Sequence, residues 1–263
     1  MSTEEAVQLT LDTPDALLAC ILDMGELLLT SGAEVFRVED TLSRLCAAYG
    51  FTKINVFSIT SSIVLTVEGR DGRIFTQTRR IVARDTNLQR VAQVNALSRQ
   101  LCSEPVSVAD FRDNLSEIRS AKTYSLPVLA LCYAVISASF SVFFGGTWYD
   151  GIAAALSGIV VFVAQQFMGR LRMNNLLQSL LVSAFTALAV VLLVRVGIGN
   201  SPVKITIGNI MLLIHGIAFT TSLRDIINGD TISGLVGICE AVIKAIAVAI
   251  GFALVLVQMG GAV

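Results

Sequence analysis

Charged residues and histidine are scarce in this sequence, and their scarcity excludes several classes of protein. Charged residues make up 15% of the 263 residues, against about 25% in ordinary soluble domains. The chain has a single histidine, His215, and its five cysteines form no Cys-x-x-Cys pair, so we expect no metal and no cofactor. The net charge of −1 gives no support for nucleic-acid binding.

The few charges are unevenly distributed along the chain. Only six of the 19 Lys and Arg residues, and four of the 20 acidic residues, follow residue 123. This asymmetry predicts a charged, water-soluble domain over residues 1–123 and a membrane domain over residues 124–263. The first residues are acidic and have no basic region that leads into an apolar stretch. We therefore expect no secretory signal and a cytoplasmic N-terminal domain.

The first 123 residues alternate between helical and strand patterns. Apolar residues recur at helical spacing in four segments, while three segments rich in β-branched residues favour strands. Gly69-Arg70-Asp71-Gly72 is typical of a hairpin turn. The predicted helices are 14–30, 34–49, 87–102 and 108–121, with Ser107 as an N-cap, and the predicted strands are 53–60, 62–68 and 73–81. This order indicates an α+β domain.

The second half contains long apolar runs. They predict a membrane α-helical bundle of five spans, over residues 124–144, 151–168, 176–196, 205–223 and 232–257. Arg170 and Arg172 assign the loop after the second span to the inside, and the preceding loop has no Lys or Arg. The loop with Arg195 and Lys204 fits this rule poorly. We expect a multi-pass cell-membrane protein, with its lipid-embedded part preceded by the cytoplasmic α+β domain.

Glu240 and Lys244 are the ionisable residues of the last predicted span. Counted from Ile232 at about 1.5 Å per residue, Glu240 lies about 12 Å and Lys244 about 18 Å into the span. Ionisable groups at such depth are costly, and their spacing of four places them on one helix face. The two residues form either a buried structural pair or a pair that opens when a substrate or a proton passes.

His215 lies within the fourth predicted span, about 15 Å from Ile205 by the same count. Ser222 shares its helix face, and Thr221 lies beside that face. Imidazole can carry protons near neutral pH. The alternative is a histidine that simply hydrogen-bonds a backbone carbonyl.

Arg224, Asp225 and Asp230 lie in the predicted inner loop between the fourth and fifth spans. Arginine can hold a carboxylate through two parallel hydrogen bonds, and Asp225 can accept from an amine or hold Arg224 in place. The alternative is a turn with helix-end charges, because Gly229-Asp230-Thr231 favours a turn by itself. The candidate substrate or ion site therefore consists of Arg224, Asp225, Asp230, Glu240, Lys244, His215, Ser222 and Thr221.

Several stretches resemble one known family. Residues Leu212–Asp225, Gly229–Gly234 and Cys239–Ala241 are similar to the membrane signature of the threonine/serine exporter family. Residues Gly25–Glu39 and Asn87–Asn95 resemble the soluble domain of the same family. The resemblance covers nearly the whole chain, and its segments occur in the family's order.

The resemblance implies an inner-membrane exporter of threonine and serine or of a dicarboxylate such as succinate, coupled to protons or another ion. The chain is similar to the larger, amino-terminal component of the split type. The resemblance therefore implies a short second membrane subunit that carries the family's carboxy-terminal spans. A homo-oligomer of this chain is a further option. Two positions depart from the family: His215-Gly216 replaces Pro-Gly, and Gly237–Cys239 lacks an Arg ahead of the Glu-Ala pair.

Two other functions compete with transport. One is an accessory or regulatory subunit without transport of its own. The other is a membrane-anchored hydrolase, but the first half has no histidine for a Ser-His-Asp set. Cys46 and Cys102 likewise have no nearby segment that contains histidine. We therefore expect no enzyme.

Overall fold

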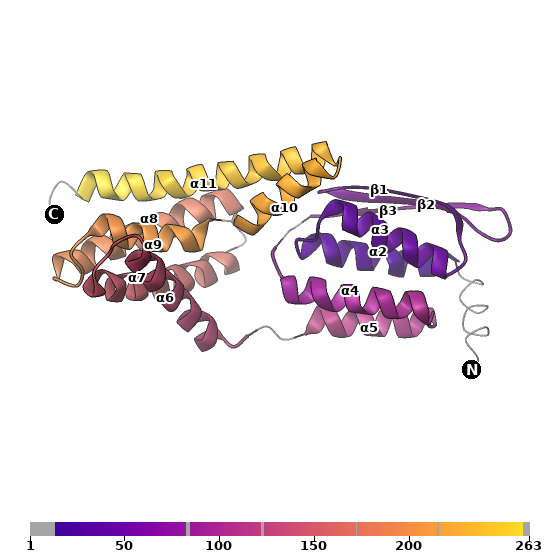
Figure 1. The fold of residues 1–263 in the computed structure, drawn as a ribbon, viewed down its shortest axis with the longest axis horizontal. Helices are drawn as coiled ribbons and strands as arrows, with labels where there is room; N and C mark the ends of the chain where they lie inside the picture. The colour runs from indigo at the N-terminus through magenta and orange to yellow at the C-terminus, as the bar shows by residue number, and fades with distance from the viewer. Residues whose placement is uncertain (1–13, 83–84, 122–123, 172, 215, 260–263) are drawn as a thin grey trace. The chain divides into compact units, whose positions relative to one another are not determined.

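The computed structural model describes residues 14–82, 85–121, 124–171, 173–214 and 216–259. The chain forms two compact units (Figure 1). The sheet-containing unit comprises Met1–Lys122 and Ile217–Ile238, and the helical unit comprises Thr123–Gly216 and Cys239–Val263. The sequence analysis places all of residues 124–263 in one membrane domain, whereas here residues 217–238 group with the sheet.

Three layers make up the sheet-containing unit. The antiparallel sheet has the order β1-β2-β3, α2 and α3 pack against it, and α4 and α5 pack on these two helices (Figure 1). The elements are α2 (Pro14–Thr30), α3 (Val35–Ala48), β1 (Thr52–Ile59), β2 (Ser62–Glu68), β3 (Ile74–Arg80), α4 (Leu88–Ser103) and α5 (Val108–Ser120). All seven elements predicted from the first 123 residues are therefore present, and the α+β expectation for this segment is confirmed.

Local chemistry explains these elements. In β2, every second residue (Ile63, Leu65 and Val67) is fully buried against the helices, as expected for a strand with one covered face. The turn after β2 closes through a hydrogen bond from the Gly69 nitrogen to the Arg73 carbonyl, and Gly72 adopts φ of 78°. Ser107 caps α5 by accepting a hydrogen bond from the Asp110 nitrogen, as predicted.

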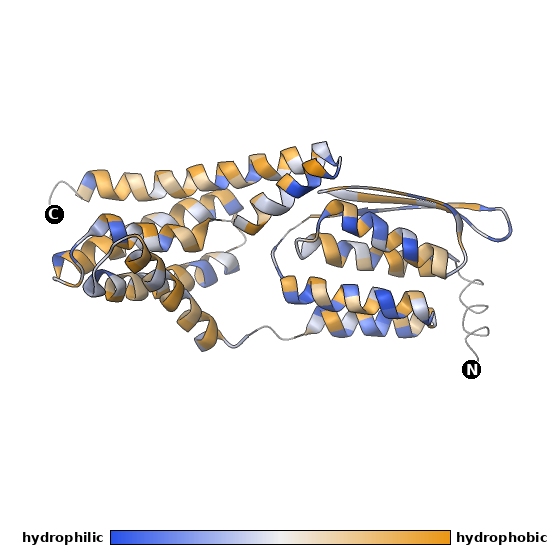
Figure 2. Cartoon of the chain, in the orientation of Figure 1, coloured by the Kyte–Doolittle hydropathy of each residue, from blue (hydrophilic) through white to orange (hydrophobic). Residues whose placement is uncertain are grey.

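The helical unit consists of apolar helices. Its elements are α6 (Leu126–Phe143), α7 (Trp148–Arg170), α8 (Asn175–Arg195), α9 (Pro202–Leu213) and most of α11 (Thr231–Met259). Among the described residues, α6, α7, α8 and α11 are long and apolar enough to cross a membrane, and their apolar composition is visible in Figure 2. This agrees with the predicted spans near the same positions.

The fourth predicted span differs from its expectation. The stretch that was expected to form one helix is divided into α9, which ends at Leu213, and α10 (Gly216–Ile227). The two helices count as a fifth span only if they are taken together as one broken span. The break occurs although this chain has no proline at His215-Gly216, so the departure from the family's Pro-Gly does not produce a continuous helix.

Gly208 lets α9 approach α6 closely within the helical unit. A Cβ atom at this position would lie 2.4 Å from the backbone oxygen of Ser137, which cannot rotate away. We expect Gly208→Ala to destabilise the protein by about 1–3 kcal/mol, because the two helices must separate. Thermal unfolding in detergent measures the effect. Gly169→Ala, at a helical glycine with no atom within 4 Å of the added carbon, is the matched control and should be neutral or stabilising.

Candidate functional site

The last turn of α10 contacts the first turn of α3, and this contact was not predicted from the sequence. The Asp225 Oδ1 atom accepts a hydrogen bond of 3.1 Å from the Val35 backbone nitrogen, across 190 residues of sequence. Val35 is the first residue of α3, and the side chain of its N-cap, Glu34, makes no capping bond. Because the first N–H groups of a helix have no partner within the helix, Asp225 supplies the missing acceptor and places a negative charge at the helix N-terminus. Asp225 is only 3% exposed.

Arg224, the neighbouring residue, holds a carboxylate of the same segment. Its Nη1 atom donates to Glu34 Oε1 in a short, charge-assisted hydrogen bond. The other Glu34 oxygen lies 3.5 Å from Arg37 Nε, so the Glu34 carboxylate lies between two guanidinium groups. The Arg224 side chain is 55% exposed, which leaves part of its guanidinium accessible.

Two of the segments that carry the family resemblance therefore meet at one place. Residues Gly25–Glu39 include Glu34 and Val35, and residues Leu212–Asp225 include Arg224 and Asp225. Asp225 was expected to hold Arg224 in place or to accept from an amine. In the structure Arg224 pairs with Glu34 and Asp225 accepts from Val35, so both side chains join α10 to the beginning of α3.

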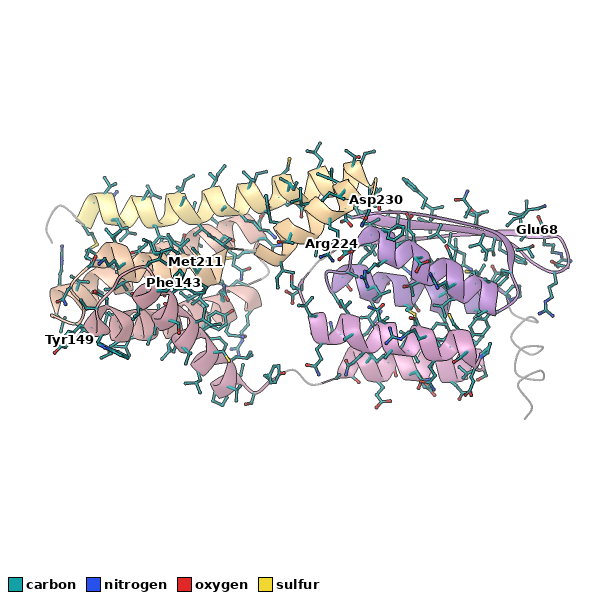
Figure 3. All side chains as sticks on the ribbon, viewed as in Figure 1. Glu68, Phe143, Tyr149, Met211, Arg224 and Asp230 are labelled. Carbon is teal, nitrogen blue, oxygen red and sulfur yellow. The ribbon has the colours of Figure 1, made fainter. Side chains whose placement is uncertain are left out.

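Asp230 lies near Glu39, between α10 and α11 (Figure 3). Glu39 Oε1 accepts hydrogen bonds from the Ser58 backbone nitrogen, at 2.6 Å, and from the Ser58 hydroxyl, at 3.1 Å. Burial raises the pKa of Glu39, the bonds from Ser58 oppose this, and the charge of Asp230 raises it further. Burial also raises the pKa of Asp230. Two carboxyl groups beside α10 therefore have an increased tendency to hold a proton.

Glu39→Gln is expected to change how stability depends on pH. A raised pKa in the folded state stabilises the fold below the unfolded pKa, near 4.5, and this contribution is lost as the pH rises through the folded value. The amide oxygen of Gln can still accept from Ser58 but carries no charge. We expect the variant to be more stable than the wild type at neutral pH, with the difference shrinking towards pH 4. Unfolding curves over this pH range, with the exposed Glu104→Gln as control, test this; a pH-independent difference contradicts it.

Ser222 and Thr221 bond to their own helix. The Ser222 hydroxyl donates to the Ala218 carbonyl at 2.8 Å, and the Thr221 hydroxyl donates to the same carbonyl at 3.1 Å. Ser222 is buried, and a Cβ atom on Gly237 would lie 2.1 Å from its oxygen, so the start of α11 packs closely on it. His215, the remaining candidate of the fourth predicted span, lies outside the described residues.

Glu240 and Lys244 share a face of α11, but no ion pair joins these two described side chains. Glu240 is exposed and Lys244 is half-buried. With 29 residues, α11 is longer than the roughly 20 residues that a bilayer requires. Its length therefore allows Glu240 to lie nearer a membrane surface than the depth that was counted from Ile232.

A neutral polar cluster inside the helical unit escaped the sequence analysis. Asn209 of α9 accepts from the Ser137 hydroxyl of α6 at 2.9 Å, and its amide donates to the Ser157 hydroxyl of α7 at 2.7 Å. All three residues are fully buried. On α6, one turn before Ser137, the Tyr133 hydroxyl donates to Gln165 of α7 at 2.6 Å. A search for ionisable residues misses such a cluster; the helical spacing of Tyr133 and Ser137 is the signal that could have revealed it.

A buried carboxylate fastens two loops at one end of the same unit. Asp150 is 1% exposed. One of its oxygens accepts from the backbone nitrogens of Asn200 and Ser201, at 2.7 and 2.8 Å, and the other accepts from the nitrogen and the hydroxyl of Thr147. The loop before α7 is thereby tied to the loop before α9. With all these bonds made inside the protein, Asp150 is a structural group.

Fold and site together indicate a multi-pass membrane protein of the transporter class. No group of three or more His, Cys, Asp or Glu residues that could hold a metal ion occurs among the described residues. A family model described as "Putative threonine/serine exporter" matches residues 19–259. The chain therefore belongs to the threonine/serine exporter family, which confirms the resemblance seen in the sequence.

Relatives of two lengths match the chain. The "Threonine/serine exporter" of Corynebacterium glutamicum is 24% identical over 221 residues, which cover 80% of this chain and 44% of that protein. The "Probable succinate transporter subunit YjjP" of Escherichia coli strain K12 is 22% identical over 240 residues, which cover 91% of this chain and 93% of that protein. A protein of the same name from Klebsiella aerogenes is 23% identical over 235 residues, which cover 89% and 90%. The chain thus spans less than half the length of the first relative, and no solved structure gives a significant match.

Proposed function

We propose that this chain is one component of an exporter of small carboxylate-bearing metabolites and that it works with a second, short membrane subunit. Family membership supports export, and the names of the relatives suggest either threonine and serine or succinate as substrates. The length comparison and the word "subunit" in the name of the Escherichia coli relative support a second subunit. The chain covers 93% of that relative but only 44% of the Corynebacterium glutamicum exporter.

The observation that carries the proposal is the carboxylate held by Arg224. The guanidinium of Arg224 binds the Glu34 carboxylate while more than half of its side chain stays accessible. All of the proposed substrates carry a carboxylate, so a substrate can compete with Glu34 for the same donor. Glu34 then acts as an internal stand-in for the substrate carboxylate.

This exchange would link substrate binding to a movement of α10. When a substrate replaces Glu34, the Arg224–Glu34 contact is lost, while the Asp225 bond to Val35 can persist. Glu39 and Asp230, whose pKa values are both raised, lie beside this contact and can take up a proton at the same step. We therefore propose proton coupling through this carboxyl pair, with His215 as a further candidate carrier.

The rest of the predicted site is proposed to line the route of the substrate across the membrane. Glu240, Lys244, Thr221 and Ser222 remain candidates. The positive charge of Arg170 at the end of α7 favours the cytoplasmic side for this end of the helix, and we propose that the sheet-containing unit lies on the same side of the inner membrane. A carboxylate within an apolar helix is costly unless it faces a polar group or water.

Glu240→Gln tests that part of the proposal. We expect export to fall at least about tenfold, as for the loss of one charge-assisted contact, while the amount of inserted protein stays unchanged. Efflux from vesicles and membrane extraction measure the two quantities. Glu240→Asp, which keeps the charge, is the matched control and should retain part of the activity. Wild-type efflux in Glu240→Gln would remove this residue from the site.

An accessory role without transport is the second candidate, favoured by the same partial coverage of the single-chain exporter. Efflux of labelled serine and labelled succinate from proteoliposomes separates the two functions. The chain is reconstituted alone, and then with its second membrane subunit. We expect no flux from the chain alone and flux from the chain with its second subunit. We also expect that the Arg224→Gln variant shows no flux when it is paired with the same subunit. Full activity of that variant pair would assign transport to the other subunit, and flux from the chain alone would remove the need for a partner.

A further inference from the structure

A small pocket opens between α2 and α5 of the sheet-containing unit, separate from the contact of α10 with α3. Its volume is about 100 Å³, which is smaller than the cavity of about 150 Å³ known to hold benzene. The pocket suits a group of few non-hydrogen atoms and is too small for a nucleotide. Its lining residues are Cys20, Asp23 and Leu27 from α2, and Arg112, Leu115, Ser116 and Arg119 from α5.

Two arginines of the lining are arranged along one face of α5. Arg112 and Arg119 are seven residues apart, which is two helical turns and about 10 Å along the axis. Leu115 lies on the same face between them. Neither arginine forms an ion pair with any carboxylate in the part of the chain that the structure describes. Both side chains are exposed, so both guanidinium groups can reach a ligand at the mouth of the pocket.

The other residues that line the pocket do not repel an anion. Asp23, its only carboxylate, is engaged by Arg79 of β3, whose Nη2 atom bonds to Asp23 Oδ1. Leu27, at 4% exposure, gives the pocket an apolar floor, and the buried Cys20 thiol beside it is hydrogen-bonded to the Arg112 side chain. The pocket therefore offers two separated cationic groups with an apolar surface between them.

We propose that this pocket binds a short dicarboxylate, with one carboxylate on Arg112, the other on Arg119 and the carbon spacer over Leu115. Guanidinium binds carboxylate oxygens through two parallel hydrogen bonds, so two guanidinium groups on one helix face offer one such site to each of two carboxylates. A monocarboxylate has only one carboxylate to offer to the two groups. The site goes beyond the proposed export function, because it uses none of the residues proposed for export and gives the sheet-containing unit a ligand of its own.

Calorimetric titration of the purified full-length chain in detergent tests the proposal. The probes are succinate, serine and sulfate. We expect succinate to bind, and Arg112→Gln and Arg119→Gln each to weaken its binding at least about tenfold. Arg99→Gln, at an exposed arginine of α4 outside the pocket, is the matched control and should bind succinate as the wild type does.

Each other outcome overturns the assignment. Sulfate or serine binding as tightly as succinate would reduce the pocket to a general anion site. Unchanged succinate binding in both pocket variants, or none in the wild type, would remove the site. Titration of Arg224→Gln separates this proposal from the export function. That variant lacks the proposed substrate clamp but keeps the pocket, so it should retain the succinate binding that depends on Arg112 and Arg119, whether or not the export proposal holds.

Discussion

Exchanging the charges of Arg224 and Glu34 is expected to restore the folding of the chain but not its export activity. Each single reversal, Arg224→Glu or Glu34→Arg, brings two like charges together where α10 meets α3. The double variant reinstates an ion pair in the opposite sense, so we expect a favourable coupling energy of about 0.5–3 kcal/mol in the mutant cycle. The exchanged pair, however, offers a carboxylate where the substrate carboxylate needs a guanidinium, so export should stay at least about tenfold reduced.

Two measurements on the same four proteins decide this prediction. Thermal unfolding in detergent reports the coupling energy, and efflux from proteoliposomes with the second subunit reports export. Arg37→Gln is the control, because Arg37 also approaches Glu34, at 3.5 Å, but is 66% exposed and lies outside α10. It should change both quantities little. If the exchanged pair recovered export together with stability, Arg224 would be a structural residue and the competition mechanism would fail.

Two substitutions of Asp225 are expected to distinguish its contribution to stability from its contribution to export. In Asp225→Asn, an amide oxygen can still accept from the Val35 nitrogen, whereas Asp225→Ala leaves this buried N–H without its acceptor. We expect Asp225→Ala to lose about 1–2 kcal/mol of stability, as for removal of a helix cap, and Asp225→Asn to lose less. Export should fall at least about tenfold in both variants, because both lack the negative charge beside the substrate clamp.

The test compares the stability of each Asp225 variant with its export activity. Near-normal unfolding of Asp225→Asn, together with normal insertion, would show that its loss of export is not a folding defect. Asn175→Ala, at an exposed position of α8, checks that substitution alone does not alter insertion. Wild-type efflux in Asp225→Asn would restrict this carboxylate to the role of an N-terminal acceptor for α3.

Local patterns predicted most of the fold. The helices and strands before residue 121 follow from apolar periodicity and from turn residues such as Gly69 and Gly72, because neighbours in sequence determine them. Hydropathy located the long apolar helices within a few residues. The division between α9 and α10 was not predicted, since the apolar pattern continues through Ile214 and no proline marks the break. Composition alone cannot distinguish a continuous helix from a broken one of equal hydropathy.

The candidate site was predictable only in part. Arg224 and Asp225 stand out as charges beside an apolar run, but their partners lie 190 residues earlier, and a single sequence holds no record of that contact. Glu34 begins a predicted helix, and nothing in the sequence around it indicates a distant partner. Asn209 was missed for a different reason. A search for charged residues does not find amide and hydroxyl groups, although the structure places Asn209, Ser137 and Ser157 between three helices.

The two ends of α9 differ in how firmly they are held. At its beginning, Asp150 accepts hydrogen bonds from the backbone nitrogens of Asn200 and Ser201, and the side chain of Lys204 donates to the Gly145 carbonyl. At its other end the helix stops at Leu213, where the span is interrupted. The beginning of α9 is therefore hydrogen-bonded to the loop before α7, whereas its other end, where Leu213 is buried among apolar side chains, adjoins the interruption. Any rearrangement of this span should therefore leave the Asp150 end at rest and be largest around the interruption, so labels beside Leu213 should report substrate-dependent distance changes that labels beside Asn200 do not.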